Sequence, residues 1–297
     1  MPRLSIIVLS YNTREVTEQS LLSLFKTLAL EKTECEVVVA DNGSTDGSVE
    51  MLKKLLKTPL PSTIQCILIM NHDNKGFTVG NNAALKKTTG EYVLFLNSDV
   101  LVTNVVFRPI LDFLDDNRMV GALTVTVSLE DGKHDMAAHR GFPTIWNAFY
   151  YFSQLEKLTA AIPYIRTLFG GYHLNYMDFG RIHEVDAISG AFLLTRRSLL
   201  TELKGFDEDY FMYGEDIDLC YRIKKKGFSI VYYPTFSVVH LKYKSGLRKE
   251  KTKTQHKTKD YFYDAMKIFF DKHYSSSYPS FVKPLIHSLI DLKKNLS

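Results

Sequence analysis

The sequence predicts an α/β protein built on a mostly parallel sheet with helices on both faces. Between residues 5 and 99, short apolar runs alternate with stretches whose apolar side chains recur at helical spacing. Each apolar run ends in polar residues, and parallel α/β sheets bind their ligands beyond the carboxyl ends of the strands. The chain of 297 residues, 45% of them hydrophobic, is long enough to build one large packed domain.

The predicted elements follow one another in βαβα order. We expect strands over residues 5–9, 36–40, 64–70 and 92–96, and helices over residues 13–30, 46–57 and 78–87. The strand runs are almost wholly apolar, which is typical of strands that helices cover on both faces. Asp46 is the expected N-cap of the second helix, and Gly90 follows the third helix. Alternation of this kind predicts crossover connections and hence a parallel sheet.

The composition indicates an intracellular enzyme. No apolar run approaches the ~20 residues that span a bilayer, and the N-terminus lacks the features of a signal peptide. Cys35, Cys66 and Cys220 are far apart and not at zinc spacing, which is typical of free thiols in a reducing compartment. We therefore expect a cytoplasmic protein.

The charge is unevenly distributed. Residues 242–259 hold eight Lys or Arg and one Glu, a local charge of +7, so the total of +4 leaves −3 for the rest. Such a block is either a solvated connector or a surface that binds anions. Nucleic acid is not the expected partner, because no recognition module accompanies the block. Further on, residues 281–296 predict a helix that either docks on the domain or lies on a membrane.

The middle of the chain, residues 141–180, is rich in aromatic side chains, among them its single tryptophan, Trp146. One interpretation is a helical insertion whose aromatic side chains fill a core. The other is an acceptor platform or a membrane-facing lip, since Tyr and Trp suit boundaries between water and apolar matter.

Polar residues end four successive predicted strands, at positions 10–12, 41–44, 71–76 and 97–99. These ends meet at one edge of a parallel sheet, which predicts a binding cleft there. Asp41 can accept a hydrogen bond from a base or ribose, and Asp99 can hold Mg²⁺ or Mn²⁺ on a diphosphate. Neither a G-x-G-x-x-G fingerprint nor a Walker sequence occurs, which argues against a dehydrogenase or a P-loop NTPase.

A second candidate site lies within residues 207–218. Two acidic clusters, residues 207–209 and 215–218, flank the aromatic patch at 210–213. Burial beside large apolar side chains disfavours the charged form of a carboxylate, and a general base or metal ligand benefits from such a setting. Asp218 and Arg222 have the spacing of a structural ion pair on a helix.

Together these motifs resemble the inverting family 2 glycosyltransferases with the GT-A fold, over residues 3–245. The pattern is most similar to the rhamnosyltransferase-type branch, which builds bacterial surface polysaccharides. The matching segments are SIIVLSYN (5–12), ADNGSTDGS (40–48), NKGFTVGNNAAL (74–85), GEYVLFLNSDV (90–100), SGAFLLTRRSLL (189–200) and GFDEDYFMYGEDIDLCYRIKKKG (205–227).

The resemblance implies a donor site. Asn97 and Asp99 stand at the D-x-D position of the family, where Asp99 would bind a divalent metal, Mn²⁺ or Mg²⁺, and Asn97 offers at most a neutral oxygen. His240 would complete the metal shell. The residues that would hold the nucleoside, base and phosphates are Ser10, Asn12, Asp41, Asn74, Lys75, Gly76 and Asn81.

The resemblance also implies a mechanism. Asp216 falls at the position of the catalytic base, which would take the proton from an acceptor hydroxyl as that oxygen attacks the anomeric carbon. Glu215 would orient Asp216 or contact the acceptor. The expected transition state is oxocarbenium-like.

These implications define the expected organisation and partners. Residues 1–245 form the transferase domain, with 141–180 as an acceptor-side insertion, and residues 246–297 form a basic linker and helical tail.

The donor is a dTDP-, UDP- or GDP-sugar, with dTDP-rhamnose the first choice, and the acceptor is a glycan or lipid-linked saccharide. We expect peripheral contact with the inner face of the cell membrane, and related enzymes include homodimers. The alternatives are a sugar-phosphate nucleotidyltransferase and a non-catalytic scaffold that binds nucleotide sugars.

Overall fold

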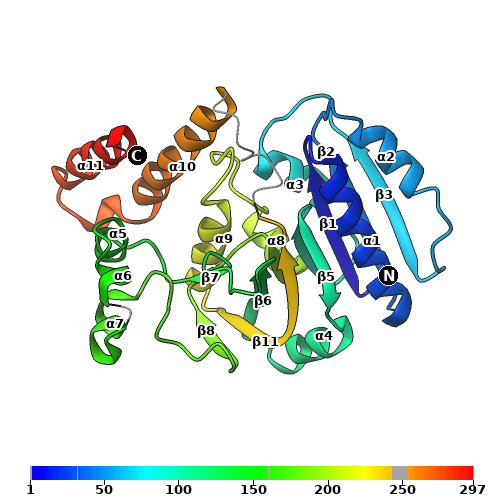
Figure 1. Cartoon of the computed structure of the whole chain (residues 1–297), viewed down its shortest axis with the longest axis horizontal. Helices are drawn as coiled ribbons and strands as arrows, with labels where there is room; N and C mark the ends of the chain where they lie inside the picture. Colours follow the sequence, from blue (N-terminus) through cyan, green and yellow to red (C-terminus); the bar gives the residue numbers. More distant parts are fainter. Residues whose placement is uncertain (1, 32, 160, 243–252, 297) are drawn as a thin grey trace.

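The computed structural model describes residues 2–31, 33–159, 161–242 and 253–296 (Figure 1). The strands are β1 (Leu4–Ser10), β2 (Cys35–Asp41), β3 (Ile64–Met70), β4 (Tyr92–Asn97), β5 (Val100–Asn104), β6 (Val120–Leu129), β7 (His139–Arg140), β8 (His183–Val185), β9 (Ala187–Ile188), β10 (Phe192–Arg196) and β11 (Ser229–His240). The helices are α1 (Arg14–Glu31), α2 (Ser48–Leu55), α3 (Phe77–Leu85), α4 (Phe107–Asp116), α5 (Ile145–Phe152), α6 (Leu155–Thr159), α7 (Pro163–Phe169), α8 (Arg197–Leu203), α9 (Glu215–Lys225), α10 (Lys253–His273) and α11 (Val282–Leu296).

The central sheet has the order β3-β2-β1-β4-β10-β6-β11-β5, with β8 paired to β11. The four strands predicted from the sequence, β1 to β4, form its parallel half. Strand β10 then runs antiparallel to both β4 and β6, while β11 runs parallel to β6. The predicted mostly parallel α/β sheet is therefore confirmed, although its second half is mixed.

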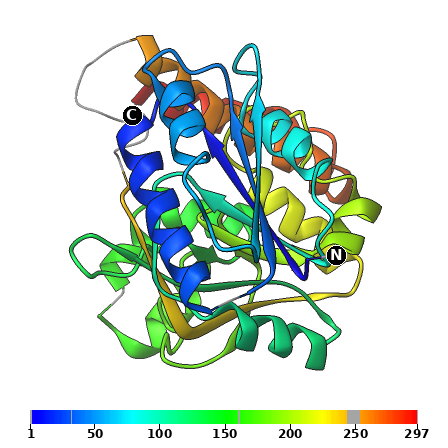
Figure 2. The same ribbon diagram turned by 90° about the vertical axis from the view of Figure 1, so that its right-hand side faces the viewer.

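Helices cover both faces of this sheet, as the sequence predicts. Along β1, Ile6 and Val8 point into the hydrophobic cluster under α1 and α4, and Ile7 points into the cluster under α3, α8 and α9. Figure 2 shows α1 on one side of the strands and α9 on the other. Burial on both faces explains why the run from Leu4 to Val8 contains so few polar residues.

The prediction that Asp46 caps the second helix is wrong. Helix α2 begins at Ser48, and its N-cap is Gly47, whose φ of 85° places it in the left-handed region. The carboxylate of Asp46 lies one residue further out, where it accepts hydrogen bonds from the Ser48 amide and from the Arg14 amide, both at 3.0 Å. Asp46 thus joins the starts of α1 and α2 and does not cap either helix in the predicted position.

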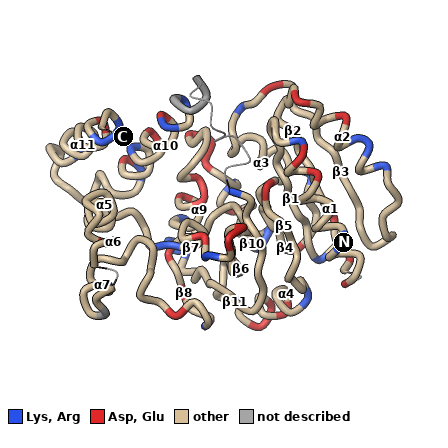
Figure 3. Tube along the Cα trace, in the orientation of Figure 1, with Lys and Arg blue, Asp and Glu red and all other residues tan. Residues whose placement is uncertain are grey.

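The middle of the chain is helical, as one interpretation predicts, and forms α5 to α7. Its aromatic side chains divide between two environments. Phe142 and Phe179 pack against the core, whereas Trp146 and Phe149 on α5 are 65% and 54% exposed. Figure 3 shows few charged positions along this segment. An exposed apolar surface on three short helices is unusual and calls for a ligand or a surface to cover it.

The C-terminal helices dock on the domain. Helix α10 packs across α9, where Phe269 is buried and Tyr261 stacks on Phe211 with ring centres 4.4 Å apart. Helix α11 lies against α10 and buries Ile290, but the other apolar residues of the predicted face, including Leu285 and Leu289, stay exposed. Most of the basic block lies outside the described residues, as does the expected domain boundary at 245, because residues 243–252 are not described.

Candidate functional site

A cavity of about 1150 Å³ lies at the edge of the sheet where β1 and β4 end. Its walls come from the loops after these strands, from the start of α9, and from the surfaces of α5, α10 and α11 that face one another. A site for a single small ligand usually measures ~300–1,000 Å³, so this cavity has room for two substrates side by side. The predicted site residues that line it are Ser10, Asn12, Asn74, Asn97, Asp99, Glu215, Asp216 and His240.

The loops after β1 and β2 are tied together by Asn12. This residue has a φ of 51°, and its side-chain oxygen accepts a 2.8 Å hydrogen bond from the Thr45 amide. Its own amide donates to the Ser44 hydroxyl at 2.8 Å. The register places Ser10 opposite Asp41, so both strands end at the same level. Parallel strands therefore bring together polar residues that are distant in the sequence.

Asp41 and Asn81 lie outside the cavity lining. Asp41 is fully buried, and both its carboxylate oxygens accept hydrogen bonds from Ser44, from the amide at 2.8 Å and from the hydroxyl at 2.6 Å. Asn81 is also buried and donates its side-chain amide to the Phe77 carbonyl at 2.9 Å. In this structure both side chains support the loops beside the cavity, and their contact with a nucleotide stays a prediction.

Gly76 and Lys75 also lie outside the lining. Gly76 has a φ of 99°, and an added Cβ would lie 2.5 Å from the Phe211 carbonyl oxygen, so only glycine fits. The next amide, from Phe77, donates to that same carbonyl at 2.7 Å. This close approach fixes the aromatic patch against the start of α3. Lys75 extends into solvent, 3.8 Å from Asp73, and its contact with phosphate stays a prediction.

A line of charged side chains crosses the base of the cavity. The Nε2 atom of His240 lies 3.2 Å from an oxygen of Asp99, and its Nδ1 lies 2.9 Å from Asp135. Lys242 donates to the other oxygen of Asp135 at 2.8 Å. Burial alone would lower the pKa of His240, but the hydrogen bonds to Asp135 and Asp99 outweigh it and raise that pKa to about 9. Asp135 thus fixes the ring so that Nε2 faces Asp99.

Asp99 and a neutral His240 suit a divalent ion that also binds a diphosphate, because a bound metal would displace the proton that the two carboxylates favour on the ring. Neighbouring ligands of an octahedral ion with bonds of ~2.1 Å lie about 3 Å apart, close to the separation of these two side chains. No group of three or more His, Cys, Asp or Glu arranged for a metal occurs among the described residues. The remaining ligands would have to come from substrate oxygens and water, which is how Mg²⁺ is usually held.

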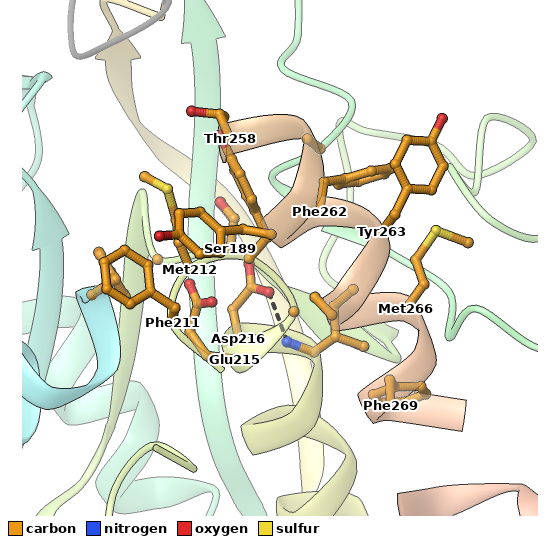
Figure 4. Close-up of a pocket in the computed structure, with 18 of the residues that line it drawn as sticks. Ser189, Phe211, Met212, Glu215, Asp216, Thr258, Phe262, Tyr263, Met266 and Phe269 are labelled. Carbon is orange, nitrogen blue, oxygen red and sulfur yellow. Dashed lines mark hydrogen bonds between the residues drawn. The ribbon is translucent and has the colours of Figure 1, made fainter. Parts of the chain in front are cut away.

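The catalytic candidates lie at the start of α9, which Gly214 begins in the left-handed region with a φ of 78°. Asp216 accepts a 2.6 Å hydrogen bond from Arg140 and a 2.8 Å hydrogen bond from the Ile217 amide. Figure 4 shows Glu215 and Asp216 between Met212 and the side chains of α10. The two carboxylates therefore lie where a substrate between the sheet edge and α10 would meet them.

Glu215 differs from its neighbour. Its side chain is buried, and its Oε2 atom has no hydrogen-bond partner among the described residues. Burial, together with the negative charge of Asp216, raises the pKa of Glu215 to about 8. A carboxyl group of this kind is protonated at neutral pH and can donate a hydrogen bond. An unpartnered polar atom beside a cavity points to a ligand that supplies the partner.

The predicted ion pair on α9 is present and has a second partner. Asp218 is fully buried and accepts from Arg222 at 2.7 Å, while His273 of α10 lies 2.7 Å from its other oxygen. This network joins α9 to α10 and so fixes one wall of the cavity. Arg140 and Asp135 were not predicted as site residues, because each lies in a loop or a two-residue strand far from its partner in the sequence.

Known proteins are similar to this chain in sequence. The family described as Glycosyl transferase family 2 matches residues 5–199. The rhamnosyltransferase WbbL of Escherichia coli (strain K12) is 28% identical over 177 residues, which make up 56% of this chain and 60% of that protein. A second relative, from Mycobacterium tuberculosis, is named N-acetylglucosaminyl-diphospho-decaprenol L-rhamnosyltransferase. It is 29% identical over 248 residues, or 80% of this chain and 76% of its own length.

A solved structure supports the fold. The crystal structure of GalNAc-T7 with UDP, GalNAc and Mn²⁺ superposes with a TM-score of 0.60 at 16% sequence identity. The likeness covers 81% of this chain and 44% of that one, and it supports a GT-A fold. This chain therefore spans less than two thirds of the length of WbbL and of GalNAc-T7.

Proposed function

Since this chain belongs to glycosyl transferase family 2, we propose that it transfers a sugar, with inversion, from a nucleotide sugar to a lipid-linked saccharide. The observation that carries the proposal is the single cavity that joins Asp99 and His240 at the sheet edge to Glu215 and Asp216 on α9. A donor diphosphate at the first pair would hold its anomeric carbon near the second pair. One cavity thus accommodates leaving group, sugar and acceptor.

We propose dTDP-rhamnose as the donor and growth of a cell-surface polysaccharide as the role. The support is the similarity to two proteins that are named rhamnosyltransferases. One of these names includes a diphospho-decaprenol, which motivates a lipid-linked acceptor for this chain as well. The proposed nucleoside site is the pair of loops after β1 and β2, where Ser10 and Asn12 line the cavity and Asp41 supports them.

The proposed chemistry is direct displacement. Asp216 accepts the proton of an acceptor hydroxyl while that oxygen attacks the anomeric carbon, and the bond from this carbon to the diphosphate breaks on the opposite face. Arg140 holds the Asp216 carboxylate in place through its 2.6 Å hydrogen bond. The protonated Glu215 donates a hydrogen bond to a substrate oxygen. Asp99 and His240 would hold a divalent ion, which neutralises the charge that develops on the leaving diphosphate.

We further propose that the chain works at the inner face of the cell membrane. None of the helices among the described residues is long and apolar enough to cross a bilayer. The support for peripheral contact is the exposed apolar surface of α5, α7 and α11, which includes Trp146, Leu168 and Leu285. Sedimentation with anionic and neutral vesicles tests the contact, and full recovery of the protein in both supernatants, as in the absence of vesicles, would rule it out.

The test of the donor is thermal stabilisation by dTDP, UDP, GDP and their sugar nucleotides, each with Mn²⁺, Mg²⁺ or chelator. A ligand that binds only the native state raises the melting temperature by mass action. We expect the largest shift with dTDP-rhamnose and metal. A larger shift with a UDP- or GDP-sugar would identify that compound, in place of dTDP-rhamnose, as the donor. The absence of any shift would contradict the nucleotide site. The anomeric configuration of the product, measured by NMR, tests inversion.

A further inference from the structure

The cavity continues past Asp216 into a region with a different lining. There it passes between α5, α10 and α11, and Figure 4 shows Phe262, Met266 and Phe269 of α10 on the far side of the two carboxylates. We define the apolar groove by the lining residues Phe149, Phe152, Phe262, Met266, Leu289 and Ile290. The cavity therefore has a polar end at the sheet edge and an apolar end between helices, with Glu215 and Asp216 in between.

The apolar groove is not needed by a nucleotide sugar. A base, a ribose, two phosphates and a sugar are polar, and the loops at the sheet edge already present the polar groups that bind them. Yet Phe149 and Leu289, on opposite walls, are 54% and 51% exposed. Apolar side chains that gather around a concave surface favour an apolar ligand, because its binding removes them from water.

Two lysines accompany the apolar side chains. Lys257 and Lys293 both line the cavity, and the Nζ atom of Lys293 lies 5.6 Å from the centre of the Phe152 ring. The neighbouring Lys294 instead pairs with Asp260 of α10 at 2.6 Å. A cation placed beside an aromatic side chain in this cavity suits an anionic group such as a phosphate.

We propose that the apolar groove binds the hydrocarbon chain of the acceptor, a long-chain phosphate or diphosphate that carries a saccharide. The chain lies between α5, α10 and α11, its phosphate lies near Lys257 and Lys293, and its sugar hydroxyl reaches Asp216. The unpartnered Oε2 of Glu215 then faces the saccharide. This inference rests on the proposed transfer reaction, and it names the part of the acceptor that the protein recognises.

Binding of farnesyl phosphate tests the groove without any turnover. Trp146 is the only tryptophan and lies on α5, so its fluorescence reports on this wall during a titration. We expect farnesyl phosphate to bind and inorganic phosphate, which lacks the chain, to give no comparable signal. Leu289→Glu should weaken binding about tenfold or more, because the chain would have to desolvate a carboxylate.

The matched control is Leu292→Glu. Leu292 lies on the same helix with a similar exposure of 56%, but it does not line the cavity. We expect this variant to bind farnesyl phosphate like the original protein. Phe149→Glu places a charge on the opposite wall and should repeat the effect of Leu289→Glu. The melting temperature of each variant shows whether it is folded.

Three results would overturn the proposal. Equal binding of farnesyl phosphate and inorganic phosphate would show that the protein does not recognise the hydrocarbon chain. An equal loss of farnesyl phosphate binding in Leu289→Glu and Leu292→Glu would place the chain on the open apolar face of α11 and not in the groove. A dimer in light scattering that both variants dissociate would assign it to a second copy of the protein.

Turnover separates this inference from the proposed function. With a saccharide acceptor on a farnesyl diphosphate and the same saccharide without the chain, Leu289→Glu should raise KM only for the first. Transfer that is equally efficient with and without the chain would reject the groove and retain the transferase. Absence of transfer from every nucleotide sugar, with farnesyl phosphate still bound, would reject the transferase and retain the groove.

Discussion

Arg140 donates a 2.6 Å hydrogen bond from Nη2 to Oδ2 of Asp216, and the two side chains are only 14% and 11% exposed. The arginine comes from the short strand β7 and the aspartate from the second residue of α9. A buried carboxylate without a partner is costly, so Arg140 makes it feasible to keep a charged base beside an apolar groove. The pair joins β7, the strand directly before the insertion that contains α5, to the site where we place the chemistry.

Replacement of Asp216 by asparagine tests its role as the base. Asp216→Asn keeps the size of the side chain but removes its capacity to accept a proton, so we expect kcat to fall by ~10²–10⁴. The affinity for the nucleoside diphosphate should be nearly unchanged, because the nucleotide binds at the other end of the cavity. Near-normal turnover of this variant would mean that the base lies elsewhere.

Removal of Arg140 tests whether the buried pair stabilises the fold. Arg140→Met leaves the carboxylate of Asp216 buried without its cation, so the free energy of unfolding should fall by about 3–5 kcal/mol. In the double variant with Asp216→Asn the carboxylate is gone, and the combined loss should be smaller than the sum of the single losses. Urea unfolding of all four proteins measures this, and strict additivity would show that the pair is not coupled.

The raised pKa of Glu215 predicts that kcat/KM decreases at alkaline pH. With that pKa at about 8, Glu215 is protonated at pH 7 and becomes charged as the pH rises through 8. Once charged, Glu215 can no longer donate its proposed hydrogen bond to a substrate oxygen, so kcat/KM should fall above this pH. Glu215→Gln stays neutral and should lack the decrease. A decrease that persists in the variant would assign it to another group.

The metal prediction concerns Asp99. Asp99→Ala removes one of the two side chains proposed to hold the ion, so Mn²⁺ should no longer increase the thermal stabilisation given by the nucleoside diphosphate. The thermal stabilisation that the nucleoside diphosphate gives without metal should change less in this variant. Asp112→Ala is a suitable control, because this aspartate lies on α4 and pairs with Arg3 at 2.8 Å outside the cavity. If metal enhances binding equally in both variants, Asp99 is not a ligand.

A stability prediction concerns Glu36, a buried carboxylate on β2. Burial alone would raise its pKa, but hydrogen bonds from Ser5, Thr89 and Gly90 outweigh this and lower it. Glu36→Gln should cost about 1–3 kcal/mol at pH 7. Because the folded-state pKa is lowered, the stabilisation by Glu36 is complete above the unfolded-state pKa of ~4.3 and is lost as the pH falls through the folded-state value. Unfolding curves of the two proteins should therefore converge in acid.

Much of the fold and part of the site follow from local patterns. The runs that became β1 to β4 are apolar because both faces of the sheet are covered, and that pattern is visible without coordinates. The polar residues after β1 and β4 were predicted to share a cleft, and Ser10, Asn12, Asn97 and Asp99 do line one cavity. The prediction of Asp46 as a cap failed, since the left-handed turn at Gly47 shifts the helix start by one residue.

The sequence by itself thus determined the α/β class, the parallel half of the sheet and the polar edge where strands end, because these depend on short-range periodicity. Only the tertiary structure decided which distant residues meet. Arg140 contacts Asp216 across 76 positions, Asp135 contacts His240 across 105, and α11 comes to line the same cavity as Ser10. Such contacts arise from packing of whole elements, and one sequence carries no local signal for them.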